Sequence, residues 1–254
     1  MPQMWQDIVL RPNPDGWGYF LKGNVNEVGY QSVCTPGSIK GLSAMLERWG
    51  TISWKAAIEP ATGIADEGFV VDAHLAANWK EPASYPEAVS TLEAIRSNAE
   101  ARRIYLKPDG ASCEAGERLR NPDYARTFER LAGAEDFYRG ELAQRMARDL
   151  SANKAFVTAE DLAEYKLREP QTVWGSYRRH RIATSQPPHG GLTLVAILNI
   201  LDHYNLRSFE HNSPEYIHLV SMAMKAAFAD RNRWLGDPDF VDVPLEEMIS
   251  AERA

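Results

Sequence analysis

One stretch, RIATSQPPHGGLTLVAILNIL at positions 181–201, constrains the fold more than any other part of the chain. Its first residues are compact or β-branched and favour a short strand. Pro187 and Pro188 end that strand, because neither residue can donate a hydrogen bond to a ladder. Gly190 and Gly191 then allow the backbone to turn tightly and to approach another group closely. The pattern predicts a strand, a tight turn and a helix.

The predicted helix at 192–201 carries apolar residues on nearly all its sides, which is typical of a buried helix. Its N-terminus follows the Gly-Gly turn, so its free N–H groups offer a place for an anion. The alternative is a strand-to-helix corner inside a core. The pattern alone favours the corner, because a glycine-rich turn without a full motif is weak evidence for a binding site.

The rest of the chain is mostly helical, with a few short strands. Helices are expected at 39–49, 53–68, 88–103, 122–133, 136–150, 159–165 and 213–236, and another begins at 244. Strands are expected at 19–21, 69–71, 104–106, 172–174 and 177–184, with a turn at 175–176 and a loop at 79–86. Strands and helices do not alternate regularly, which argues against a Rossmann sheet or a barrel. The expected class is α+β.

Composition and charge exclude several classes of protein. The chain has 254 residues, which fits one large domain or two smaller ones. Its net charge of −7 argues against a nucleic-acid surface, where a basic face is expected. It contains no apolar run of about 18 residues, so no membrane span is expected. The N-terminus lacks the pattern of a signal peptide, and the compartment stays open.

Neither cysteine nor histidine forms a recognisable site in the sequence. Two cysteines, Cys34 and Cys113, do not suggest a disulfide scaffold. Cys34 is a candidate nucleophile, but we expect a small buried hydrophobe, the usual environment of a free cysteine. The six histidines show no metal-ligand spacing, and no phosphate-binding or dinucleotide-binding glycine motif is present. No metal and no cofactor are therefore expected.

Several short sequence segments along the chain, taken together, match the motifs of one protein family. They are SVCTPGSIKGL at 32–42, WKAAIEPATGIADEGF at 54–69, the run at 116–140 that ends in FYRG at 137–140, TAEDLAEY at 158–165, PPHGG at 187–191 and AAFADRNRWLGDPD at 226–239. In this order they resemble the large subunit of gamma-glutamyltransferases (gamma-glutamyltranspeptidases). The resemblance extends over nearly the whole chain. The phrase GNVNEVGYQS at 23–32 is more similar to the acylase-like or amidohydrolase-like branch.

The resemblance implies a fold, a mechanism and a partner. Members of this family are N-terminal-nucleophile hydrolases with an αββα sandwich, and a precursor cuts itself into a large and a small subunit. The new N-terminal threonine of the small subunit attacks a small-molecule amide, with its own α-amino group as base. An oxyanion hole stabilises the tetrahedral intermediate. The implied partner is thus a small subunit carrying that threonine, with no metal or organic cofactor.

The sequence departs from the family pattern at its catalytic elements. No threonine of the chain begins a Thr-Thr-His phrase, and the R-E-x-A-P phrase, whose arginine grips the substrate carboxylate, is missing. We therefore expect residues 1–254 to be one domain, an internal piece of a large subunit, with no catalytic residue and no assigned substrate-binding residue. A non-catalytic scaffold or partner-binding domain is the alternative. A cysteine hydrolase using Cys34 with a histidine is a third, less favoured one.

Overall fold

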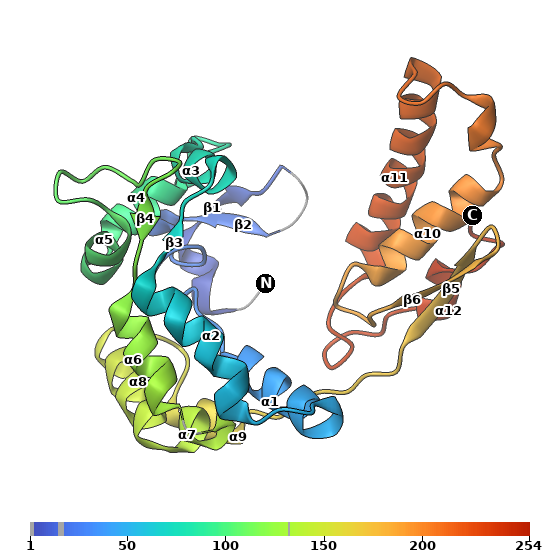
Figure 1. The fold of residues 1–254 in the computed structure, drawn as a ribbon. Helices are drawn as coiled ribbons and strands as arrows, with labels where there is room; N and C mark the ends of the chain where they lie inside the picture. Colours follow the sequence, from blue (N-terminus) through green and yellow to red (C-terminus); the bar gives the residue numbers. More distant parts are fainter. Residues whose placement is uncertain (1–2, 15–17, 132) are drawn as a thin grey trace. The chain divides into compact units, whose positions relative to one another are not determined.

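A computed structural model describes residues 3–14, 18–131 and 133–254 of the chain (Figure 1). The chain divides into two compact units, Met1–Leu167 and Arg168–Ala254. Helices dominate both units and the strands are short, so the α+β class expected from the sequence is confirmed. That the two units form one domain stays a prediction. None of the described helices is both long enough and apolar enough to cross a bilayer.

The first unit is built from short helices and two small antiparallel ribbons. It begins with η1 (Gln3–Ile8), β1 (Val9–Pro12), β2 (Tyr19–Leu21), η2 (Lys22–Asn24), α1 (Ser38–Trp49), α2 (Trp54–Glu67), β3 (Phe69–Val70) and α3 (Ala73–Lys80). It continues with α4 (Thr91–Ser97), α5 (Ala99–Tyr105), β4 (Arg118–Leu119), α6 (Pro122–Arg130), α7 (Ala134–Arg139), α8 (Glu141–Ala152) and α9 (Ala159–Glu164). Strand β1 pairs with β2, and β3 pairs with β4.

Capping residues place several helix ends where the sequence predicts them. The Ser53 side chain accepts a hydrogen bond from the backbone N–H of Ala56 and begins α2. Gly68 ends the same helix with a φ of 81°, a conformation that glycine adopts without strain. Asn121 caps α6, and Thr158 forms a capping box at the start of α9. These predictions are confirmed.

Two long helices expected from periodicity are each divided in two. The segment 88–103 breaks at Asn98, which is extended and whose side chain accepts from the N–H of Ala101 to begin α5. The segment 136–150 breaks at Gly140, where a Cβ would lie 1.8 Å from the Asp136 carboxylate. The strand expected at 104–106 is also wrong, because α5 extends to Tyr105.

Two predictions about burial and loops in this unit are wrong. Trp79, expected in a loop, lies in α3, which the Asp72 side chain caps. Its ring is buried with Val71, Cys113 and Leu119, and this hydrophobic cluster holds the segment in a helix. Cys34, expected to be buried, is exposed, and the buried thiol is that of Cys113.

Tyr138 joins three of the phrases that carry the family pattern. Its hydroxyl donates to the Pro36 carbonyl at 2.7 Å and accepts from the Lys40 N–H at 3.2 Å. Its ring stacks on Tyr165, with the centroids 5.7 Å apart. The Lys40 ammonium donates to the Tyr165 carbonyl at 2.8 Å. The ring is buried, and this burial raises the pKa of Tyr138. The three segments therefore pack against one another around the Tyr138 side chain.

The second unit places a hairpin against two helices. Its elements are β5 (Val173–Tyr177), β6 (His180–Thr184), α10 (Gly191–Asp202), η3 (Leu206–Ser208), α11 (Pro214–Trp234) and α12 (Leu245–Met248). Strands β5 and β6 are antiparallel. Gly175 of β5 lies against Val195 of α10, since a Cβ at Gly175 would come within 2.6 Å of that side chain. Val173, Leu192 and Met248 form the buried centre.

The turn of the β5–β6 hairpin lies at a different position from the one that the sequence predicts. Strand β5 runs through 175–176 without interruption, and the chain turns at 178–179 instead. Arg178 has a φ of 55°, and its guanidinium binds the carbonyls of Leu201, Asp202 and Tyr204 at the end of α10. The position of the turn is thus fixed by a contact with a distant helix end.

Candidate functional site

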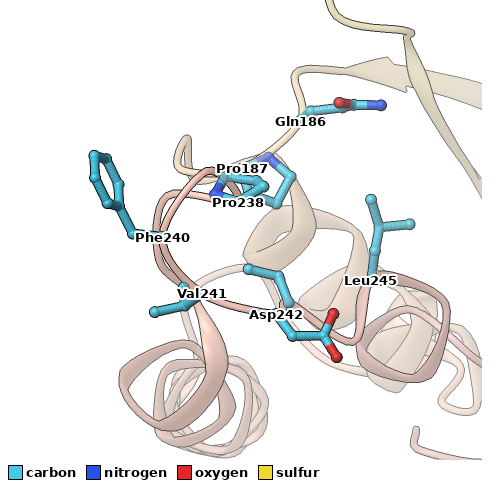
Figure 2. A pocket seen from close by; sticks show the side chains of 8 residues that line it. Gln186, Pro187, Pro238, Phe240, Val241, Asp242 and Leu245 are labelled. Atoms are coloured by element: carbon cyan, nitrogen blue, oxygen red, sulfur yellow. The ribbon is translucent and has the colours of Figure 1, made fainter.

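The Pro-Pro corner after β6 borders a cavity of about 450 Å³ in the second unit (Figure 2). Gln186 and Pro187 supply one part of the lining. The loop between α11 and α12 supplies the rest, namely Pro238, Phe240, Val241, Asp242, Val243 and Leu245. The corner and the loop are some fifty positions apart in sequence, so the cavity is a product of the tertiary fold.

The loop has a defined conformation near its start. The N–H groups of Phe240 and Val241 both donate to the Asp237 carbonyl, at 2.9 and 3.0 Å. This confirms the turn predicted at 237–239. The Arg168 guanidinium lies 3.8 Å from the Asp237 carboxylate and also binds that of Asp239. The loop is therefore held in place by its own backbone and by one arginine.

Six of the eight residues that line the cavity have apolar side chains, and two have polar ones. Asp242 is the one charged residue among the eight, and Gln186 adds a carboxamide. Figure 2 shows the Phe240 ring extending away from the other labelled side chains, and this residue is 85% exposed. The remaining lining residues are proline, valine and leucine. The cavity is open to solvent and exposes at least as much polar as apolar surface, and its one charged residue, Asp242, is itself exposed.

The Gly-Gly turn brings strand and helix into close contact, as the sequence predicts. A Cβ at Gly191 would lie 2.5 Å from the Ser185 carbonyl oxygen and 2.2 Å from the Thr184 hydroxyl. Helix α10 begins at this point, and an anion at its N-terminus stays a prediction. In this chain α10 buries Leu192 and Val195 but leaves Leu194 47% exposed, so its burial on all sides stays a prediction for the assembled protein.

The other candidate residues do not form a site in the described part of the chain. Cys34 makes no hydrogen bond with any described residue, so no histidine is placed to activate its thiol. Within 3–14, 18–131 and 133–254, no group of three histidine, cysteine or acidic side chains is arranged to hold a metal ion. The sequence predicts the turn at 237–239 but does not single out Asp242, which follows it. The available signal was the apolar pair Phe240-Val241 next to an aspartate and soon after a turn.

Comparison with known proteins gives a consistent family. A sequence model of the family described as gamma-glutamyltranspeptidase matches residues 18–254. The glutathione hydrolase proenzyme of Bacillus subtilis (strain 168) is 35% identical over 221 residues, covering 86% of this chain and 36% of that protein. The acylase ACY 1 proenzyme of Pseudomonas sp. (strain SE83) is 33% identical over 227 residues, covering 88% of this chain and 39% of that protein.

Solved structures agree with the sequence relatives. The gamma-glutamyltranspeptidase of Helicobacter pylori superposes with a TM-score of 0.81 at 29% identity, covering 91% of this chain and 65% of that one. The cephalosporin acylase of Bacillus halodurans gives a TM-score of 0.75 at 25% identity, covering 89% and 41%. The chain spans little more than a third of the B. subtilis and Pseudomonas proenzymes. The chain belongs to the gamma-glutamyltranspeptidase family, whose members are N-terminal-nucleophile hydrolases with an α+β fold.

Proposed function

We propose that this chain is the large-subunit portion of an amide hydrolase or acyltransferase that acts on gamma-glutamyl or related acyl amides. The observation that carries the proposal is the family match over 18–254 in a chain that covers 36% of a glutathione hydrolase proenzyme. The catalytic threonine then lies on a small subunit outside these residues. Within the chain, no residue takes a catalytic role in this proposal.

The lengths of the matched chains support a two-chain enzyme. This chain covers 65% of the H. pylori chain but 36% of the B. subtilis proenzyme. A family member therefore exists as a crystallised chain much shorter than the proenzymes. Cleavage of a proenzyme into two subunits accounts for that difference.

The β5–β6 hairpin offers a surface on which a small subunit would pack. Each strand has one edge that no other described strand pairs, and an open edge is a template for a further strand. On the face turned away from α10, Trp174 is 51% exposed, with the Arg181 guanidinium 4.1 Å from the centroid of its ring. An aromatic side chain beside open edges is typical of a surface that is covered in the assembled protein.

The helices of the same unit also carry exposed apolar side chains. Between 41% and 51% of the surface of each is accessible, and they are Leu194, Ile217, Met222, Met224 and Phe228. Exposed apolar side chains of this size are costly in water, so these residues support a covering partner. In the proposal that partner is the small subunit.

In the proposed reaction the small subunit supplies the nucleophile, and this chain supplies the framework that positions it. The N-terminal threonine hydroxyl attacks the amide carbonyl and its α-amino group accepts the proton. Donors at an oxyanion hole hold the negative oxygen of the tetrahedral intermediate. The intermediate collapses as the C–N bond breaks, the protonated α-amino group gives its proton to the leaving amine, and the acyl group stays on the threonine as an ester. Water or a second amine then attacks this ester, which releases the acyl group and restores the threonine hydroxyl. This chain contributes the framework on which the small subunit is positioned.

Acyl-anilide hydrolysis tests the proposal. The protein isolated with both chains is expected to release nitroaniline from gamma-glutamyl-p-nitroanilide or from another acyl anilide. The 254-residue chain alone is expected to release none, because it lacks the nucleophile. If the two-chain protein cleaves none of these anilides, the non-catalytic scaffold becomes the better account. If the single chain cleaves them, the proposed division of roles is wrong.

A further inference from the structure

We propose that the first turn of helix α10 binds a carboxylate, supplied either by a free small molecule or by a side chain of the small subunit. The turn carries a group of buried hydrogen-bond donors that no described residue pairs. This binding is a property of the chain itself. It therefore goes beyond the proposed catalytic role and does not depend on it.

The backbone supplies three of these donors. The N–H of Leu194 donates to the Gly190 carbonyl at 3.2 Å and makes the first hydrogen bond of the helix. The N–H groups of Gly191, Leu192 and Thr193 precede it and donate to no residue that the structure describes. Such groups are usually paired by a capping side chain or by water. Gly190 has no side chain to offer, and all three residues are buried, so these donors need another partner.

The Thr193 side chain supplies a fourth donor. This residue is 5% exposed, and its hydroxyl oxygen is buried without a hydrogen-bond partner among the described residues. In a helix each Cα–Cβ bond tilts toward the N-terminus, and a threonine hydroxyl reaches back toward the carbonyl of the preceding turn. Thr193 is the third residue of α10. Its hydroxyl is therefore directed toward the start of the helix, where the three N–H groups also point.

This set of donors favours a carboxylate over other ligands. An ionised carboxylate only accepts hydrogen bonds, and its two oxygens offer about four lone-pair sites for the three N–H groups and the hydroxyl. The helix dipole adds roughly half a positive charge at this end, which repels cations and suits one negative charge better than the larger charge of phosphate. Gly190 is exposed, and a Cβ there would have no atom within 4 Å, so the turn is open on this side.

An NMR titration of the isotope-labelled full chain with sodium acetate, at constant ionic strength, tests the proposal. The amide resonances of Gly191, Leu192 and Thr193 are expected to shift and to saturate. Acetamide, the neutral isostere of acetate, is expected to cause no saturable shift, and inorganic phosphate is expected to bind more weakly than acetate.

A pair of threonine variants tests the role of the hydroxyl. Thr193→Val replaces the hydroxyl with a methyl group and is expected to lose about tenfold in affinity for acetate, because a hydrogen bond to a charged group is lost. Thr172→Val removes an exposed hydroxyl of the same unit, just before β5, and should leave the affinity unchanged.

Four results would overturn the proposal. They are the absence of a saturable shift with acetate, an equal response to acetamide, tighter binding of phosphate than of acetate, and a Thr193→Val variant that binds acetate as the unaltered chain does. The first three need no variant, so the test does not depend on how a substituted chain folds.

The same titration of the two-chain protein distinguishes the two sources of the carboxylate. If the ligand is a free molecule, acetate binds there too. If a side chain of the small subunit already occupies the turn, acetate binds to the single chain only. Anilide hydrolysis is measured separately, so a failure of the carboxylate site and a failure of the proposed function are distinguishable.

Discussion

Replacing Gly191 with alanine is expected to lower the free energy of unfolding of the chain by about 2–3 kcal/mol. The added Cβ would lie 2.5 Å from the backbone carbonyl oxygen of Ser185, and this oxygen cannot rotate away. It would also lie 2.2 Å from the Thr184 hydroxyl. Because Gly191 is buried, strand β6 and helix α10 must move apart to make room. Urea denaturation followed by circular dichroism measures the loss.

The neighbouring glycine provides the matched control. Gly190 has a φ of −75°, and a Cβ there would have no atom within 4 Å. The Gly190→Ala variant is therefore expected to stay within about 0.5 kcal/mol of the unaltered chain. It can even gain stability, because alanine restricts the unfolded chain. Equal losses at 190 and 191 would contradict the close approach of strand and helix at this corner.

Truncating Trp79 to alanine is expected to cost about 3–5 kcal/mol, the range for removing a buried aromatic side chain. Trp79 is 7% exposed and packs with Val71, Ala76 and Leu119 in the main cluster of the first unit. The surrounding segment is short and cannot close the cavity that remains. The same urea titration gives the difference in unfolding free energy.

Trp49 is the control for that truncation. This residue is 70% exposed at the end of α1, beside the Arg48 guanidinium. Its replacement by alanine should change the unfolding free energy by less than about 1 kcal/mol. If both tryptophans cost the same, Trp79 is not the centre of a core, and the helix α3 that replaces the expected loop would be in doubt.

The features that the sequence predicts well are those decided within a few residues. Ser53 and Thr158 cap helices because their own side chains reach N–H groups three positions away. Gly68 ends α2 through its own backbone conformation. Such contacts are encoded locally, so the pattern around each residue is enough to place it.

The features that it misses depend on residues far away in the chain. The hairpin turn lies at 178–179 and not at the predicted 175–176, because the Arg178 side chain binds the end of α10, more than twenty positions later in the chain. Trp79 is helical because a hydrophobic cluster from distant segments surrounds it. Periodicity carries no information about these partners.

In the candidate site, too, the local turns can be predicted from the sequence and the contacts between distant segments cannot. The turn at 237–239 and the tight corner at Gly191 are both evident in the sequence. The meeting of Gln186 and Pro187 with Pro238 in one cavity is not evident there, because it requires α10 and α11 to pack together first. The exposed Leu194 was also unforeseen in detail, since an apolar helix does not reveal which of its sides this chain leaves uncovered.

In the proposed function these residues belong to one half of a self-processed two-chain enzyme. Intact mass and N-terminal sequencing of the protein purified from its native source distinguish this enzyme from a single-chain scaffold. We predict two chains that stay together, one containing these residues and one beginning with threonine. A single chain containing these residues, with no threonine-headed partner, would contradict the claim and leave the scaffold as the better account.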